Sequence, residues 1–161
     1  SEAARAAALG LGAAAAVAPG ADLLAITEGG AHVSVDAIGS VDVLAASVRS
    51  LRPRGRHVQV GLLLGSAAEA AVPMGAVISR ELEVLGSHGM PSRDYPGLLA
   101  LVASGAIDPR RLVGRVIGLE GAGAALAGMS EPTRAAGAAG SVGSVGLTAG
   151  ITVVEPPEGV C

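Results

Sequence analysis

The sequence contains no lysine, phenylalanine or tryptophan, and Tyr95 is its only tyrosine. Without lysine the chain has no side-chain amine for a Schiff base and no lysine general base. Its formal net charge of −3 and its single tyrosine provide neither the basic surface nor the stacking platform that nucleic-acid binding requires. These absences exclude lysine-based catalysis and predict no nucleic-acid partner.

Cysteine is nearly absent too, because Cys161 is the only one in 161 residues. A single thiol cannot form an internal disulfide, and with three scattered histidines it cannot supply a tetrahedral zinc site. We therefore expect no metal ligands within this chain. The cysteine usage favours a reducing, cytoplasmic location.

Long and strongly apolar runs are also missing. Residues 6–21 and 135–154 are uncharged, and the second stretch is long enough to cross a bilayer. Both stretches are rich in alanine and glycine, and the second also contains Ser141, Ser144 and Thr148. Such residues are weakly apolar for a lipid-facing helix, so the sequence predicts no membrane partner.

The residues that are present favour a folded α/β protein. Half of them are hydrophobic and 16% are charged, a balance that is typical of globular chains. Helical and strand-like spacings alternate along the chain, which indicates a parallel sheet. Helices are predicted at residues 2–11, 21–28, 41–51, 95–104 and 120–129, and strands at residues 32–36, 57–64, 82–87, 115–119 and 151–154. Residues 74–81 are predicted to form a short helix or a turn.

Glycine lies near the carboxyl end of three of the predicted strands. Gly39 follows the first strand and its terminal Asp36, Gly61 lies in the second, and Gly89 follows the third. In open α/β sheets ligands bind beyond these ends, and glycine lets a ligand approach the backbone. One ligand crevice explains all three turns, while a plain strand-to-helix turn is the alternative at Asp36.

The histidines and the absence of two common motifs limit the reactions that the sequence can indicate. His88 lies in the third turn and could act as a general acid or base, but no polar partner can be assigned to it, which favours an ordinary loop histidine. His32 and His57 fall at predicted strand starts and are interpreted as structural. No G-x-S-x-G elbow and no intact G-x-G-x-x-G turn occur, so the sequence shows neither a serine hydrolase nor a pyrophosphate-binding turn.

Several segments together suggest a family. GGAHVSVDAIGS, LRPRGRHVQVGL, VPMGAVISRELEVLGSHGM, DYPGLLALVASGAIDPRRLVGRVIGLEGAGAALAGM and AGITVVEP, taken in order, resemble the medium-chain, zinc-dependent-type alcohol dehydrogenases. Residues 104–129 are the most specific part. The resemblance implies an incomplete Rossmann-like parallel sheet, with the first βαβ elements, their glycine-rich turn and the zinc-binding catalytic domain upstream of these residues.

The resemblance also implies a cofactor, NAD or NADP, and a small alcohol or carbonyl substrate in complete relatives, whose zinc has no ligands in this chain. Residues 115–119 and 151–154 resemble segments that return to the catalytic domain, and residues 82–87 resemble a strand that pairs subunits into a homo-oligomer. No catalytic residue is assigned. The implied cofactor-binding residues are Ala37, Ile38, Gly39, Val60, Gly61, Leu62, Ser87, His88 and Gly89.

Three parts are expected along the chain. Residues 1–134 form a partial dinucleotide-binding domain, residues 135–150 a loop or insertion rich in glycine, alanine and serine, and residues 151–161 a final strand and tail. The expected function is the cofactor-binding portion of an NAD(P)-dependent oxidoreductase, inactive as an isolated chain. A non-catalytic truncated remnant and a zinc-free quinone or enoyl reductase are the alternatives.

Overall fold

A computed structural model describes residues 1–130 and 150–157 of the chain. The chain divides into two compact units. The central unit is Pro19–Met90, and the terminal unit combines Ser1–Ala18 with the described part of Pro91–Cys161. The expected boundaries at residues 134 and 150 stay a prediction, and residues 135–149 of the expected loop lie outside the described residues.

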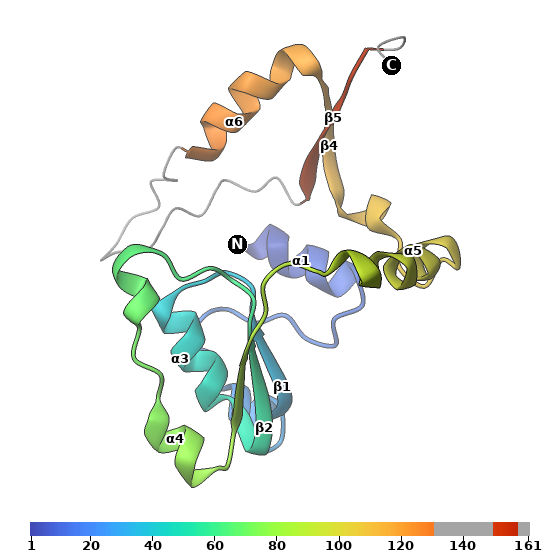
Figure 1. Ribbon diagram of the computed structural model, residues 1–161. Helices are drawn as coiled ribbons and strands as arrows, with labels where there is room; N and C mark the ends of the chain where they lie inside the picture. The colour runs from blue at the N-terminus through green and yellow to red at the C-terminus, as the bar shows by residue number, and fades with distance from the viewer. Residues whose placement is uncertain (131–149, 158–161) are drawn as a thin grey trace. The chain divides into compact units, whose positions relative to one another are not determined.

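The central unit is built on a three-stranded parallel sheet (Figure 1). Its strands β1 (Ala31–Asp36), β2 (Leu51–Gln59) and β3 (Glu83–Gly86) lie in the order β1-β2-β3. Parallel neighbours require crossover connections, and these contain α3 (Val41–Arg49) and α4 (Met74–Ser79). The parallel α/β prediction is confirmed, and all three strands end at the same edge of the sheet.

The core of the central unit lies where α3 packs on β1 and β2. Ser40 caps the helix by accepting a hydrogen bond from the Val43 amide at 3.2 Å. Leu44 and Val48 are one helical turn apart, so both face the sheet and are buried. The buried core cluster is Leu44, Val48, Leu51 and Leu82.

The second strand differs from its prediction at both ends. Helix α3 ends at Arg49 rather than residue 51, and β2 begins at once because Leu51 is fully buried and pairs with Ala31. The strand then ends at Gln59 rather than residue 64. The amides of Val60 and Gly61 both donate hydrogen bonds to the carbonyl of Asp36, so the regular pairing between β1 and β2 ends there.

Short helices complete this unit. The predicted helix at residues 21–28 is a single turn, α2 (Leu23–Ile26), which Asp22 caps by accepting hydrogen bonds from the Leu24 and Ala25 amides at 3.1 Å each. A 3₁₀ turn, η1 (Gly65–Glu69), precedes α4. Residues 74–81, predicted as a short helix or a turn, contain the helix α4.

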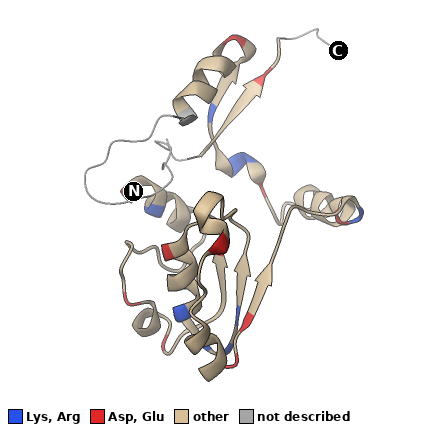
Figure 2. Ribbon diagram, turned by 60° about the vertical axis from the view of Figure 1, so that its left-hand side comes forward, with Lys and Arg blue, Asp and Glu red and all other residues tan. Residues whose placement is uncertain are grey.

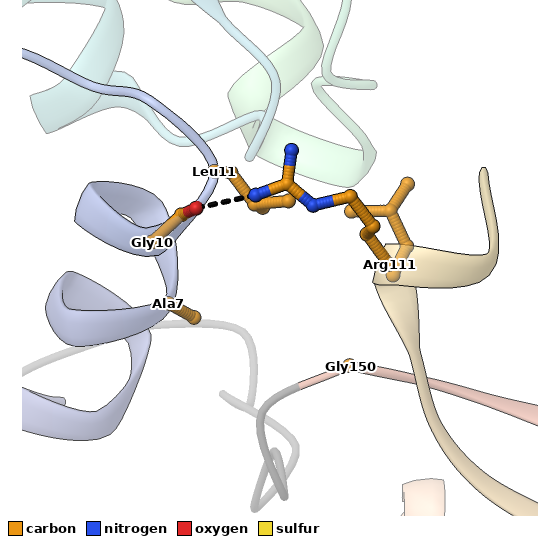
Figure 3. Close-up of a pocket in the computed structure, with 6 residues that line it drawn as sticks. Ala7, Gly10, Leu11, Arg111 and Gly150 are labelled. Carbon is orange, nitrogen blue, oxygen red and sulfur yellow. Dashed lines mark hydrogen bonds between the residues drawn. The ribbon is translucent and has the colours of Figure 1, made fainter. Parts of the chain in front are cut away.

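The terminal unit contains a two-stranded parallel sheet of β4 (Val113–Gly118) and β5 (Ile151–Glu155), separate from the central sheet. Both strands were predicted. Arg111 donates a hydrogen bond to the carbonyl of Gly10, and a cavity of about 260 Å³ lies beside this bond (Figure 3). The helical elements of this unit are α1 (Glu2–Gly10), η2 (Ser92–Asp94), α5 (Tyr95–Ala103), η3 (Pro109–Leu112), η4 (Leu119–Gly121) and α6 (Ala122–Ser130).

No helix in the described part of the chain is long and apolar enough to cross a membrane.

Candidate functional site

Three loops leave the central sheet side by side at its carboxyl edge. Asp36 of β1 pairs with Gln59 of β2, which in turn pairs with Gly86 of β3. The loops at residues 37–40, 60–62 and 87–89 therefore start from one row of the sheet. We call these three loops the carboxyl edge. Ligands of open α/β sheets bind at this position.

The first two loops cross each other backbone to backbone. Gly39 has a φ of +81°, and a Cβ placed on it would lie 2.8 Å from the main-chain nitrogen of Leu62. A Cβ on Gly61 would lie 2.6 Å from the carbonyl carbon of Ile38. Only glycine fits at both positions, because any side chain would push the two loops apart.

Asp36 holds both loops at once, through its side chain and its main chain. Its buried carboxylate accepts hydrogen bonds from the amides of Ile38 at 2.8 Å and Gly39 at 2.9 Å. Its main-chain carbonyl accepts from the amides of Val60 at 2.9 Å and Gly61 at 2.7 Å. Asp36 therefore has the role of a strand-to-helix turn residue, which was the alternative interpretation of its position in the sequence. Its carboxylate orders the carboxyl edge rather than facing a ligand.

The Asp36 carboxylate is ionised in this setting. Burial favours the neutral acid and by itself would raise the pKa of Asp36. Hydrogen bonds from the Gly39 amide, the Gln59 side chain and the Ile38 and Ser40 amides favour the charged form, and together they lower the pKa below its ordinary value. A fixed negative charge therefore lies beneath the first loop at neutral pH.

Apolar side chains stand out from these two loops. Ile38 is 75% exposed and Leu62 is 60% exposed, although both follow strands of the core-bearing sheet. Ala37 and Val60 are exposed as well. Exposed branched side chains next to a tight backbone crossing provide an apolar surface on which a flat ring can rest.

The third loop is tied to the sheet only at its first residue. The Ser87 amide donates to the Gln59 carbonyl at 2.9 Å. His88 and Gly89 are exposed, and the hydrogen bonds within the described residues do not include the His88 ring. The structure thus brings residues 37–39 and 60–62 together, with Ser87 beside them, but does not orient His88.

Two polar residues of this region were missed or misplaced by the sequence interpretation. His57 is fully buried and is the seventh of nine residues in β2, so its assignment to a strand start is wrong. The error arose because the prediction began the strand six residues too late. Gln59 ends the same strand and donates hydrogen bonds to Asp36 and to the Gly61 carbonyl. The sequence feature that indicates these two residues is a polar side chain at every second position, both in β1 and in β2.

Zinc does not fit the described residues. They contain no group of three or more His, Cys, Asp or Glu side chains that could hold a metal ion. Acidic and basic residues are coloured on many separate elements of the ribbon (Figure 2).

Comparison with known proteins gives a consistent result. A family model described as zinc-binding dehydrogenase matches residues 1–104. D-xylulose reductase A from Aspergillus oryzae is 34% identical over 93 residues, which are 58% of this chain and 25% of the relative. D-arabitol-phosphate dehydrogenase from Enterococcus avium is 34% identical over 84 residues, covering 52% of this chain and 23% of the relative.

Solved structures resemble the chain over a larger part of its length. A zinc-binding dehydrogenase from Sinorhizobium meliloti 1021 bound to NADP superimposes with a TM-score of 0.69 at 29% identity, covering 81% of this chain and 39% of the other. The 2R,3R-butanediol dehydrogenase from Bacillus subtilis gives 0.66 at 25% identity, covering 75% and 35%.

The chain spans about a quarter of the length of the curated relatives that it matches. The family model nevertheless covers well over half of it, and the matched residues include the whole carboxyl edge. The chain belongs to the zinc-binding dehydrogenase family and carries part of its cofactor-binding Rossmann-like fold.

Proposed function

We propose that the carboxyl edge of this chain forms the nicotinamide-facing wall of an NAD(P)-binding site. The observation that carries the proposal is the crossing of the first two loops through Gly39 and Gly61. It brings main chain and exposed apolar side chains to the end of a parallel sheet where ligands bind. A zinc-binding dehydrogenase with a TM-score of 0.69 to this chain is bound to NADP, which supports a nicotinamide cofactor.

Each loop has a part in this proposal. Ala37, Ile38 and Gly39 lie beside the ribose and the nicotinamide ring, where the exposed Ile38 side chain packs against a flat face. Residues 60–62 and 87–89 surround the carboxamide. Three main-chain amides of these loops already donate hydrogen bonds within the sheet: those of Val60 and Gly61 to the Asp36 carbonyl, and that of Ser87 to the Gln59 carbonyl. Hydrogen bonds to a carboxamide oxygen therefore come from the amides of Leu62, His88 or Gly89.

In the whole protein we propose hydride transfer between an alcohol and the nicotinamide. When bound, the cofactor supplies the hydride-accepting carbon, and this chain fixes the position of its ring. The named relatives are a D-xylulose reductase and a D-arabitol-phosphate dehydrogenase, which supports a polyol or a similar small alcohol as the substrate. No role is assigned to His88 in the chemistry.

The proposal extends to a partner and a location. Strand β3 is an outer strand of the central sheet, so its free edge can pair with β3 of a second copy, in line with the expectation for residues 82–87. The single cysteine supports a reducing cytoplasm. Light scattering of the protein and of a Val84→Pro variant, which loses one ladder donor, tests the pairing.

A matched pair of variants tests the cofactor site. Ile38→Asp places a charge at the carboxyl edge, and Ile78→Asp places one at an equally exposed isoleucine of α4, since the two side chains are 75% and 73% exposed. We expect Ile38→Asp to weaken NADH binding about tenfold or more because a charge cannot pack against an uncharged ring face. Ile78→Asp should bind as the parent protein does. Equal affinities in calorimetric titrations of all three proteins would contradict the site.

A further inference from the structure

Four polar side chains form a ladder across β1 and β2, just beneath the carboxyl edge. Ser34 pairs with His57 and Asp36 pairs with Gln59 in the register of the sheet, so all four side chains lie on one face. Asp36 and His57 are fully buried, and Ser34 and Gln59 are half-buried. The alternate residues Val33 and Val35 are both 54% exposed, so the polar face of β1 is the covered one.

The hydrogen bonds of this ladder run without a break from Ser34 to the first loop. Ser34 Oγ lies 3.0 Å from His57 Nδ1, and His57 Nε2 lies 3.1 Å from Gln59 Oε1. Gln59 Nε2 lies 2.9 Å from Asp36 Oδ2 and 2.8 Å from the carbonyl oxygen of Gly61. No buried side-chain nitrogen or oxygen within residues 1–128 and 150–157 lacks a partner.

Chemistry fixes the direction of the hydrogen bonds that Gln59 makes. The Asp36 carboxylate and the Gly61 carbonyl can only accept, so both hydrogens of the Gln59 amide must point at them. The Gln59 oxygen then faces His57, whose Nε2 must carry a hydrogen. In the neutral ring this leaves Nδ1 as an acceptor for the Ser34 hydroxyl.

We propose that Gln59 is the positioning residue of the carboxyl edge and that His57, oriented by Ser34, holds the amide oxygen of Gln59 while both amide hydrogens face Asp36 and Gly61. One amide group joins the carboxylate that orders the first loop to a carbonyl of the second loop. The two loops are therefore held in one geometry from beneath, in addition to their crossing through Gly39 and Gly61. The effect on cofactor affinity rests on the proposed function, whereas the loop geometry does not.

The composition of the chain makes the side-chain amide of Gln59 easy to observe by NMR spectroscopy. The chain contains no asparagine, and Gln59 is its only glutamine. A ¹H–¹⁵N correlation spectrum therefore shows a single pair of side-chain carboxamide signals, which needs no assignment. We expect this pair to exchange slowly with water, and we expect the ¹⁵N shifts of His57 to be those of a ring protonated at Nε2. Rapid exchange at the level of an exposed glutamine would overturn the proposal.

Gln59→Glu is the decisive variant. The new carboxylate still accepts from His57, but it cannot donate to Asp36 or Gly61, and it adds a like charge beside Asp36. We expect the amide signals of Ile38, Gly39 and Gly61 to shift or broaden, and NADH binding to weaken about tenfold. Ser34→Ala is the milder variant, because it frees His57 Nδ1 and leaves both Gln59 donors in place. It should change the His57 tautomer signals more than the loop amides.

Arg56→Ala serves as the control on the same strand. Arg56 faces away from the ladder and pairs with Glu83 at an exposed site, so its loss should leave the loop amides and NADH binding unchanged. If the amide signals of the two loops are unchanged in Gln59→Glu, the positioning role is wrong, whatever the affinity for NADH. Shifted loop amides in Gln59→Glu, combined with an absence of NADH-induced shifts in the parent protein, would support the positioning role and contradict the proposed function.

Discussion

The central and terminal units use the same kinds of apolar residue but bury them very differently. In the central unit Leu44, Val48 and Leu51 are at most 3% exposed. In the described part of the terminal unit no residue is buried, and Leu99 of α5 is 61% exposed. Leucine and valine content therefore does not by itself make a core.

Connectivity explains the difference. In the central unit a helix follows β1 directly and returns the chain to a parallel neighbour, so α3 is laid against the strands on either side of it in the sequence. Helix α5 is apolar on all sides and is followed by η3 and a strand that pairs with β5 rather than with the sheet before it. A helix without a single apolar stripe has no preferred face to bury in a small unit.

Hydrogen exchange gives the strongest test of this contrast. Amides of β1 and β2 are covered by α3, so they open only when the central unit unfolds. We expect their exchange to be at least about a hundredfold slower than that of α5, whose hydrogen bonds are close to solvent. Mass spectrometry of peptides from the two regions measures the ratio. Comparable rates would show that the terminal unit has a protected core after all.

A pair of leucine truncations sharpens the comparison at single residues. Leu51→Ala empties a fully buried position in the core cluster, and we expect it to reduce the free energy of unfolding by about 2–5 kcal/mol. Leu99→Ala on α5 removes the same atoms from an exposed position and should change it by less than about 0.5 kcal/mol. Urea denaturation of the two variants gives both values, and similar losses would contradict the difference in burial.

Asp36 gives the central unit a pH dependence. Its pKa is lower in the folded protein than in the unfolded chain, so its contribution to stability is complete above the unfolded value of about 3.9 and is lost as the pH falls through the folded value. Asp36→Asn should reduce the free energy of unfolding by about 1–3 kcal/mol at neutral pH. The NH₂ group of the new asparagine would face the Gln59 NH₂ group, which now donates to the Asp36 carboxylate, and two donors cannot bond to each other.

The same variant should be less sensitive to acid than the parent protein. Denaturation midpoints measured at pH 7 and in steps down to about pH 3 provide the comparison. A parent protein and an Asp36→Asn variant that lose stability in parallel with falling pH would show that other carboxylates are responsible.

The smallest effect is expected at the exposed ion pair of β2 and β3. Arg56 donates to Glu83 at 2.7 Å, which lowers the pKa of Glu83, but both side chains are about half exposed. Solvent screens such pairs, so Arg56→Ala should leave the urea midpoint unchanged within error. A clear loss of stability that high salt abolishes would show that the pair matters more than its exposure indicates.

The sequence by itself determined the class of the fold and the position of the glycines at the carboxyl edge. Alternating spacings predicted the parallel α/β arrangement, and glycines after the strands predicted the carboxyl edge, because backbone approach demands glycine whatever the rest of the fold does. The segments that resemble alcohol dehydrogenases predicted the family. These signals are local, so they can be read along the chain.

Only the tertiary structure decided which side chains hold the edge together. His57 and Gln59 are 21 or more residues from Ser34 and Asp36, and they meet only because the register of β1 and β2 pairs them. A strand start misplaced by six residues was enough to hide this ladder. The boundary was misread because Leu51 extends the strand through burial and through its pairing with Ala31, and neither is visible in the spacing of residues.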